Sequence, residues 1–198
     1  AIAIVRLSGP ASQDIVAETF RREHARPGDG KLPPGVMVLG YAREAETGAR
    51  IDQCLVVVWK APHSYTGENM AEFHLHGSQM VVGRVIAALI AAGARMAQPG
   101  EFTRRAYDNG KLDLAQAEAV CDLIRSRTEA AGRSALAQLG GELSQRLGAV
   151  REKLIPVTAE LEAYVDFPEE GLEFQTRDRL GRAVDECLRE LTDLEESA

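Results

Sequence analysis

The sequence predicts an α+β domain followed by a partial, all-α helical bundle. Residues 1–109 mix short β-branched apolar runs with helical patterns, whereas residues 110–198 carry helical patterns alone. In the first region the middle strands follow one another without intervening helices, which favours a mixed sheet with helices over a doubly wound parallel sheet. We therefore expect two domains, 1–109 and 110–198.

Composition narrows the class of protein. Of the 198 residues, 45% are hydrophobic and 27% are charged, which is ordinary for a soluble globular protein. No apolar run is long enough for a membrane-spanning helix and no signal peptide is recognisable, so we expect a cytoplasmic protein without membrane contact. The cysteines lie far apart without a CxxC pair, which argues against a disulfide framework or a zinc site: Cys54, Cys121 and Cys187.

The net charge of −7 is concentrated near the C-terminus. Residues 160–198 hold 13 acidic and 4 basic side chains, so residues 1–159 carry about +2. Charged outer faces of helices explain this distribution without a special function. The balance gives no sign of the clustered basic face that nucleic-acid binding normally needs.

The chain opens with an apolar, β-branched run that predicts a strand over residues 1–9. Residues 10–20 then predict a helix, because their apolar positions fall on one stripe: Ile15, Val16, Thr19 and Phe20. Arg6 interrupts the first strand. It either extends along the strand to solvent or meets an anion, and the local pattern leaves both open.

Two further strands are predicted over residues 36–42 and 51–60, and the second is apolar enough to be central in its sheet. A polar loop with Gly and Pro follows, of the kind that carries function on a rigid scaffold. Residues 70–76 alternate, which places Glu72, His74 and His76 on one strand face. A solvated face of an edge strand is the favoured interpretation. A metal site, or a pocket in which Glu72 binds an organic ligand, are the alternatives.

The stretch from residue 98 to 124 joins the two predicted domains. After a helix over 78–92, a Pro-Gly turn and residues 101–103 lead into a short helical pattern that carries Arg104 and Arg105, and residues 108–110 break it. Lys111 lies in this break. It either contacts a ligand or, as its local chemistry favours, is one of the surface charges of a domain hinge. Asp113 and Gln116 form a capping box that starts the next helix.

All later patterns are helical. An apolar stripe with steps of three and four predicts one long helix over 136–164, or two helices broken near Gly140-Gly141, or one bent at Pro156. Residues 167–171 should end it, and a last helix follows over 180–191. The apolar stripes exceed what these helices can cover for one another, so we expect further helical partners.

Several motifs occur in the order in which one protein family has them: IVRLSGP, APHSYTGEN, EFHLHGS, QPGEFTRRAYDNGKLDLAQAEAVCDLI and VDFPEE. Through them nearly the whole chain resembles the N-terminal and first helical portions of the bacterial and organellar tRNA uridine-5-carboxymethylaminomethyl modification GTPases, the MnmE or TrmE family. The central motif is too long for chance to be a good explanation.

The resemblance implies a dimerising domain similar to folate-binding aminomethyltransferase modules, with a tetrahydrofolate derivative (5-formyl- or 5,10-methylene-tetrahydrofolate) bound at the dimer. It also implies a helical domain into which a GTPase domain is inserted, and GTP, magnesium and potassium would belong to that GTPase domain. With its flavin-containing partner MnmG, the family adds a carboxymethylaminomethyl-type group to carbon 5 of the wobble uridine of tRNA.

The folate contacts of the family match Arg6, Glu72 and Lys111 in this sequence. Their chemistry is suitable, because a carboxylate can accept both adjacent N–H donors of a pterin, and cations suit the anionic tail of folate. The sequence leaves open which cation meets the tail and which meets the one-carbon end. No catalytic residue and no metal ligand is predicted in this chain.

The chain also departs from the family pattern. It contains no G-x-x-x-x-G-K-[ST] loop, so it cannot by itself cradle the phosphates of GTP, and the family's C-terminal cysteine segment is absent. We therefore expect a portion of a longer protein. Two other interpretations stay open: an assembly module that dimerises without a ligand, and a stand-alone one-carbon transferase, for which no convincing catalytic group is found.

Overall fold

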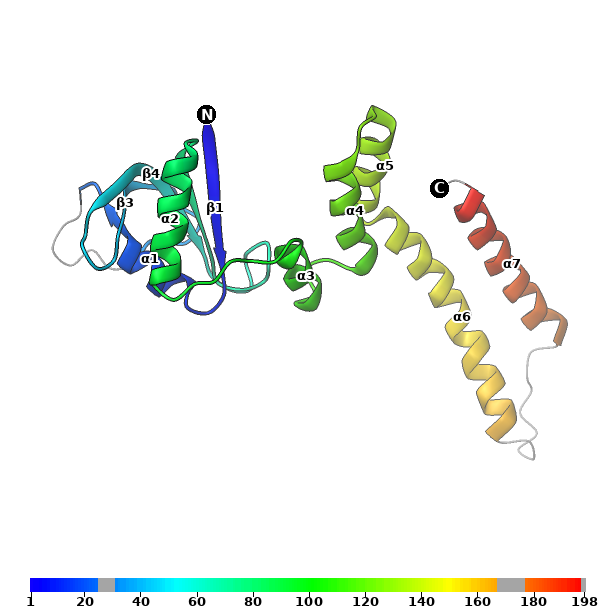
Figure 1. Ribbon diagram of the computed structural model, residues 1–198. Coiled ribbons are helices and arrows are strands. Elements are labelled where there is room, and N and C mark those ends of the chain that lie inside the picture. The colour runs from blue at the N-terminus through cyan, green and yellow to red at the C-terminus, as the bar shows by residue number, and fades with distance from the viewer. Residues whose placement is uncertain (25–30, 167–176, 197–198) are drawn as a thin grey trace. The chain divides into compact units, whose positions relative to one another are not determined.

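The computed structural model describes residues 1–24, 31–166 and 177–196, so the predicted helix end at 167–171 lies outside the described residues. The chain divides into two compact units, Ala1–Ala117 and Glu118–Ala198. The first contains a sheet with helices and the second contains helices (Figure 1). The predicted α+β part followed by a helical part is therefore confirmed.

The first unit is built on a five-stranded sheet with the order β1-β5-β4-β3-β2. Each pairing of neighbouring strands is antiparallel, so the prediction of a mixed sheet is wrong apart from an isolated parallel bridge between Pro34 and Val58. Short connections between successive strands produce antiparallel neighbours, whereas parallel neighbours need a long crossover. The strands are β1 (Ile2–Ser8), β2 (Phe20–Arg22), β3 (Val38–Arg43), β4 (Arg50–Trp59) and β5 (Met70–His76).

Strand positions differ from expectation at two places. The central position of β4 is confirmed, but β5 lies between β1 and β4, so the favoured interpretation of residues 70–76 as an edge strand is wrong. Strand β2 is absent from the sequence prediction, which places Phe20 in the preceding helix. Phe20 instead pairs with Ala42 of β3 and meets the ring of Phe73 edge-on, with centroids 6.4 Å apart. Pairing with a distant segment overrides the local helical pattern.

Two helices cover one face of this sheet, α1 (Ser12–Thr19) and α2 (Gln79–Ala91) (Figure 1). The core between them and the sheet contains Val56, Phe73, Leu75, Val85 and Leu89, all buried. Each such side chain stabilises the fold by about 1.5–3 kcal/mol. Because side chains alternate along a strand, the residues of β5 between the core positions face the other side of the sheet.

A third helix, α3 (Glu101–Asp108), follows in the first unit, which ends within the first turn of α4 (Leu114–Arg125). The predicted capping box is present: Asp113 Oδ1 accepts from the Gln116 backbone N–H at 2.8 Å, and Gln116 Oε1 accepts from the Asp113 N–H at 3.0 Å. Two orphan donors at the start of α4 are thereby satisfied.

The later helices are α5 (Glu129–Leu139), α6 (Glu142–Asp166) and α7 (Arg177–Glu196). Of the three possibilities for the long pattern, the break at Gly140-Gly141 is correct, because Gly141 adopts a left-handed φ of 87°. Pro156 lies inside α6 without ending it. Helices α6 and α7 pack together around Val150 and Cys187. None of the helices in the described ranges has the length and hydropathy needed to span a lipid bilayer.

Candidate ligand-binding site

Arg6 and Glu72 form an ion pair on the sheet face opposite α1 and α2. The antiparallel register places Arg6 of β1 directly across from Glu72 of β5. Arg6 Nε and Nη2 lie 2.8 and 2.7 Å from Glu72 Oε1. The Glu72 side chain is only 11% exposed, so its charge needs such a partner. The register therefore joins two of the three residues that the family resemblance singled out.

Two aromatic rings flank the Arg6 guanidinium. Its central carbon lies 5.2 Å from the ring centroid of Tyr65 and 5.6 Å from that of Phe102, within the range of cation–π attraction. Tyr65 belongs to the loop between β4 and β5, and Phe102 belongs to α3. The Tyr65 hydroxyl and Thr103 Oγ1 are 3.0 Å apart, which ties this loop to the helix.

His74 lies on the other side of the Glu72 carboxylate. Its Nε2 is 3.3 Å from Glu72 Oε2, close enough for an ion pair but without the alignment of a hydrogen bond. The His74 side chain is 22% exposed, yet its Nε2 atom is buried and has no hydrogen-bond partner in the described part of the chain. Glu72 therefore has Arg6 at one oxygen and an unpaired ring nitrogen beside the other.

Lys111 is positioned by the cap of α3. The N–H of Gly110, with φ of 67°, donates to Tyr107 O at 2.9 Å, and the N–H of Lys111 donates to Ala106 O at 2.8 Å. This pair of bonds is a Schellman motif. The Lys111 side chain is exposed, and its Nζ makes no hydrogen bond or ion pair with any residue that the structure describes. The structure does not bring Lys111 into contact with Arg6 or Glu72.

The loop between β4 and β5 nevertheless touches the surroundings of all three residues. A Cβ added at Gly67 would lie 2.9 Å from Asn109 Cβ and 3.2 Å from Lys111 Cγ. Two residues earlier in the same loop, Tyr65 packs against Arg6. This loop therefore connects the Lys111 turn to the Arg6–Glu72 pair.

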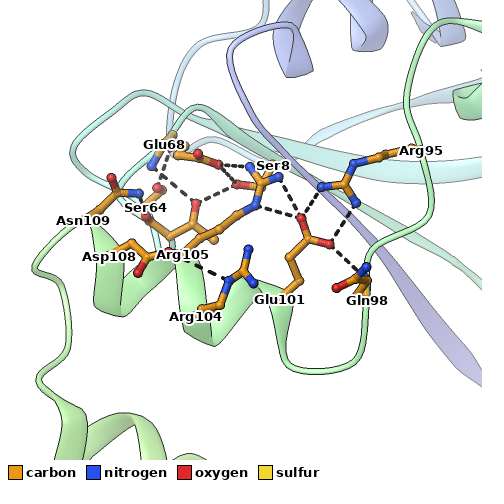
Figure 2. Close-up of polar contacts among 11 residues, drawn as sticks. Ser8, Ser64, Glu68, Arg95, Gln98, Glu101, Arg104, Arg105, Asp108 and Asn109 are labelled. Atoms are coloured by element: carbon orange, nitrogen blue, oxygen red, sulfur yellow. Dashed lines mark hydrogen bonds and ion pairs between the residues drawn. The ribbon is translucent and has the colours of Figure 1, made fainter.

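A polar network on α3 holds this region together (Figure 2). Glu101 accepts hydrogen bonds at 2.5 and 2.9 Å from Arg95, at 2.8 Å from the Gln98 backbone N–H, and at 2.8 and 3.1 Å from Arg105. These bonds hold the pKa of the Glu101 carboxyl well below its usual range. The bonds from Arg95 contribute most, followed by the bond from Gln98 and then by those from Arg105. Glu101 is therefore ionised throughout the physiological pH range.

The network continues to β1 through Glu68 (Figure 2). Glu68 Oε2 accepts from Arg105 Nη1 at 2.7 Å and from Ser8 Oγ at 2.8 Å. Ser8 Oγ is also 2.7 Å from Oγ1 of the buried Thr66, whose backbone oxygen accepts from Asn109 Nδ2 at 2.7 Å. Strand β1, the loop and α3 thus form one hydrogen-bonded assembly around the site.

A pocket of about 460 Å³ runs beside β1. Arg6, Phe102 and Arg105 line it together with apolar residues of α2, among them Leu89 and Ile90. Its size is in the range of small-molecule sites. Glu72 and Lys111 are not among its lining residues, so Arg6 and Phe102 are where the pocket meets the ion pair.

Glu72, His74 and His76 of β5 do not converge on one site. No group of three or more His, Cys, Asp or Glu side chains that could hold a metal ion is found among the described residues. His76 turns to Asp52, with Nδ1 2.8 Å from Oδ1, and leaves Glu72 and His74 as neighbours. Sequence reasoning missed the roles of Tyr65 and Phe102, because only the strand register and the loop position bring them to Arg6.

Comparison with known proteins identifies both units. The family model described as "GTP-binding protein TrmE N-terminus" matches residues 1–111, and the model "MnmE helical domain" matches residues 114–198. Proteins named "tRNA modification GTPase MnmE" are similar throughout the chain. The relative from Symbiobacterium thermophilum is 46% identical over 96% of this chain, and the one from Chlorobaculum tepidum is 43% identical over 100%.

The similarity covers only part of these relatives. The chain spans 41% of the length of each of these two proteins, and 42% of a Thermus thermophilus relative that is 47% identical over 93% of this chain. Both family models and the relatives agree on one assignment. The chain belongs to the MnmE (TrmE) family, of which it carries the N-terminal domain and a helical part.

Proposed function

We propose that this chain is part of a tRNA modification GTPase and that its first unit binds a tetrahydrofolate one-carbon donor. The whole protein, with the flavin-containing partner MnmG, adds a carboxymethylaminomethyl-type group to carbon 5 of the wobble uridine of tRNA in the cytoplasm. GTP, magnesium and potassium act in a GTPase domain, whose phosphate-binding motif is not in this sequence. The boundary between the folate-binding and helical domains is proposed at residues 109 and 110.

The observation that supports folate binding is the Glu72 carboxylate. It is mostly buried and oriented by a charge-assisted hydrogen bond from Arg6 Nε and an ion-pair contact with Arg6 Nη2. Both contacts are with Oε1, so lone pairs of the carboxylate remain for a ligand. The two adjacent N–H donors of a pterin fit such a carboxylate in bidentate fashion, and the Tyr65 and Phe102 rings supply a flat apolar border.

Lys111 and Arg6 are the cations proposed for the rest of the ligand. The glutamate tail of folate is anionic, and the Lys111 ammonium has no partner in the described part of the chain that would neutralise it. The loop that packs on Arg6 through Tyr65 also packs on Lys111 through Gly67. The loop therefore lies against both cations, and both are proposed to contact one ligand.

Ligand-dependent melting tests this function. We expect 5-formyl-tetrahydrofolate at a hundredfold excess over Kd to stabilise the chain by about 2.7 kcal/mol, which is measurable as a rise in the thermal midpoint. Glu72→Gln removes the charged acceptor and should abolish most of this rise. Glu44→Gln is the control, because Glu44 forms an ion pair of 2.7 Å with Arg84 at the surface, away from the site. A midpoint that is unmoved in the unsubstituted chain would contradict folate binding.

The second candidate is an assembly module that dimerises through the first unit without a ligand. Large apolar side chains lie on the sheet face that α1 and α2 do not cover, and they favour this second function. Ile2, Ile4, Leu39 and Leu55 are all exposed there. A homodimer would cover them. Light scattering that finds a dimer, combined with melting that finds no folate response, would select this function over the first.

A further inference from the structure

We propose that His74 is a specificity-determining residue of the folate site, whose Nε2–H donates to the carbonyl oxygen of the pterin that Glu72 binds. The inference rests on the proposed folate-binding function. It assigns a role to a side chain outside the set Arg6, Glu72 and Lys111, and it predicts which pteridines the site accepts.

The first observation is the unpaired nitrogen itself. Nε2 of His74 is buried and, within the described residues, has no hydrogen-bond partner. A buried polar atom without a partner is unfavourable, and a ligand that supplies the partner recovers that loss on binding. The atom lies 3.3 Å from Glu72 Oε2, so whatever binds this carboxylate passes next to it.

The second observation concerns the proton on that nitrogen. A bare lone pair on Nε2 would lie beside the lone pairs of Glu72 Oε2 at 3.3 Å, which is unfavourable. We therefore assign the imidazole hydrogen to Nε2, which makes this atom a donor. Across the sheet His74 faces apolar residues, Ile4 of β1 and Leu55 of β4, and the neighbouring His76 is occupied by Asp52. These neighbours offer Nε2 no alternative acceptor.

The third step is the order of groups along the pterin edge. A 2-amino-4-oxo pteridine presents an amino donor, a ring N–H donor and a carbonyl acceptor in a row. The carboxylate takes the two donors, and the carbonyl oxygen then needs a donor placed beside the carboxylate. Arg6 already directs Nε and Nη2 to Oε1, whereas the free donor is at Oε2. The carbonyl oxygen therefore accepts its hydrogen bond from His74.

This arrangement discriminates between two classes of pteridine. A 4-oxo compound places an acceptor against the His74 N–H. A 4-amino analogue places a donor there and, in its neutral form, has an acceptor nitrogen instead of the ring N–H that faces Glu72, so the change of the affinity ratio in His74→Leu is what isolates the His74 contact. Two donors facing each other in a buried site leave both unpaired, and sites built on a hydrogen bond reject such analogues strongly. The site should therefore prefer the 4-oxo compound over its 4-amino analogue by at least tenfold.

The test measures dissociation constants for 5-formyl-tetrahydrofolate and its 4-amino analogue by calorimetry, using the full chain and three variants. His74→Leu should weaken binding of the 4-oxo ligand about tenfold and lower the ratio of the two affinities by at least the same factor. His74→Gln supplies an amide N–H donor and should keep the ratio within about threefold of the parent. His76→Gln, on the same strand face but bonded to Asp52, is the control and should change neither constant.

Four results would overturn the proposal. If His74→Leu weakens both ligands equally, or weakens neither, then His74 does not read the carbonyl group. If His74→Gln lowers the ratio as far as His74→Leu does, the N–H donor is not what matters. If the parent chain binds neither ligand, the proposed folate function fails and this inference fails with it, which distinguishes that outcome from the others.

Discussion

Glu101 shows how one carboxylate can hold several segments of a chain in place. It accepts bonds from the guanidinium groups of Arg95 and Arg105 and from the Gln98 backbone, so it joins the turn before α3 to the first turns of that helix. Arg105 extends the connection to Glu68 and hence to Ser8 of β1. Acid that protonates Glu101 should therefore loosen the frame around Arg6.

The pH dependence of stability follows from the sign of this pKa change. The pKa of Glu101 is lowered in the folded protein from the ordinary value of 4.5, chiefly by the bonds from Arg95. As pH falls below 4.5 the unfolded chain binds the proton first, so the stabilisation present above that pH is progressively lost. Glu101→Gln should lower the urea midpoint at pH 7 and flatten its decline between pH 4.5 and pH 3.

A matched variant separates this effect from general acid unfolding. Glu129 forms an exposed ion pair of 3.1 Å with Arg133 on α5, and such pairs contribute little to stability. Glu129→Gln should therefore keep the pH dependence of the parent chain. Parallel curves for Glu101→Gln and the parent would show that Glu101 does not link protonation to unfolding.

At the scale of elements, the loop between β4 and β5 depends on a glycine. Gly67 adopts a φ of 75°, and a Cβ there would lie 2.9 Å from Asn109 Cβ. The loop can pack closely on the end of α3 only because Gly67 has no side chain. Asn109 completes the junction by donating to Thr66 O at 2.7 Å.

Gly67→Ala should destabilise the first unit by about 1–3 kcal/mol, measured by urea unfolding, because it combines a left-handed backbone with overpacking. Gly48→Ala isolates the backbone contribution, since Gly48 has a φ of 68° but no atom of the described residues lies within 4 Å of an added Cβ. The difference between the two variants measures the packing of the loop on α3. Equal destabilisation of both would mean that this packing contributes nothing.

At the scale of the whole molecule, the proposed assembly depends on the open face of the sheet, which is the face that α1 and α2 do not cover. Ile2 is 81% exposed and Leu39 is 45% exposed, on a face where the helices of this unit do not lie. The proposed homodimer would bury this face and bring the neighbouring Arg6–Glu72 pair close to the second copy.

Leu39→Glu should weaken the proposed dimer about 100-fold, since it buries an unpaired carboxylate at the interface. Light scattering over a concentration series measures this as a shift towards the mass of the monomer. Met80→Glu adds the same charge at a 64% exposed position of α2, outside the open face, and should leave the mass unchanged. The same mass for Leu39→Glu and the parent would place any dimer interface elsewhere.

Much of the architecture could be predicted from local patterns. Alternation and helical periodicity found β1, β3, β4, β5 and the long helices to within a few residues, and the capping box of Asp113 and Gln116 is present as expected. The break at Gly140-Gly141 was one of three options that periodicity allowed. The ligand roles of Arg6, Glu72 and Lys111 come from family resemblance and stay predictions.

The sequence by itself determined the class of fold, the order of its elements and the family, because periodicity, caps and motifs are local properties of the chain. Only the tertiary structure decided that β5 is internal, that Arg6 faces Glu72 and that the His74 ring nitrogen is buried with no partner among the residues that the structure describes. Arg6 and Glu72 are 66 positions apart, and local patterns do not specify which strand edges join. That choice is made by the burial of the apolar face of the whole sheet under α1 and α2, which sets the register and thereby the site.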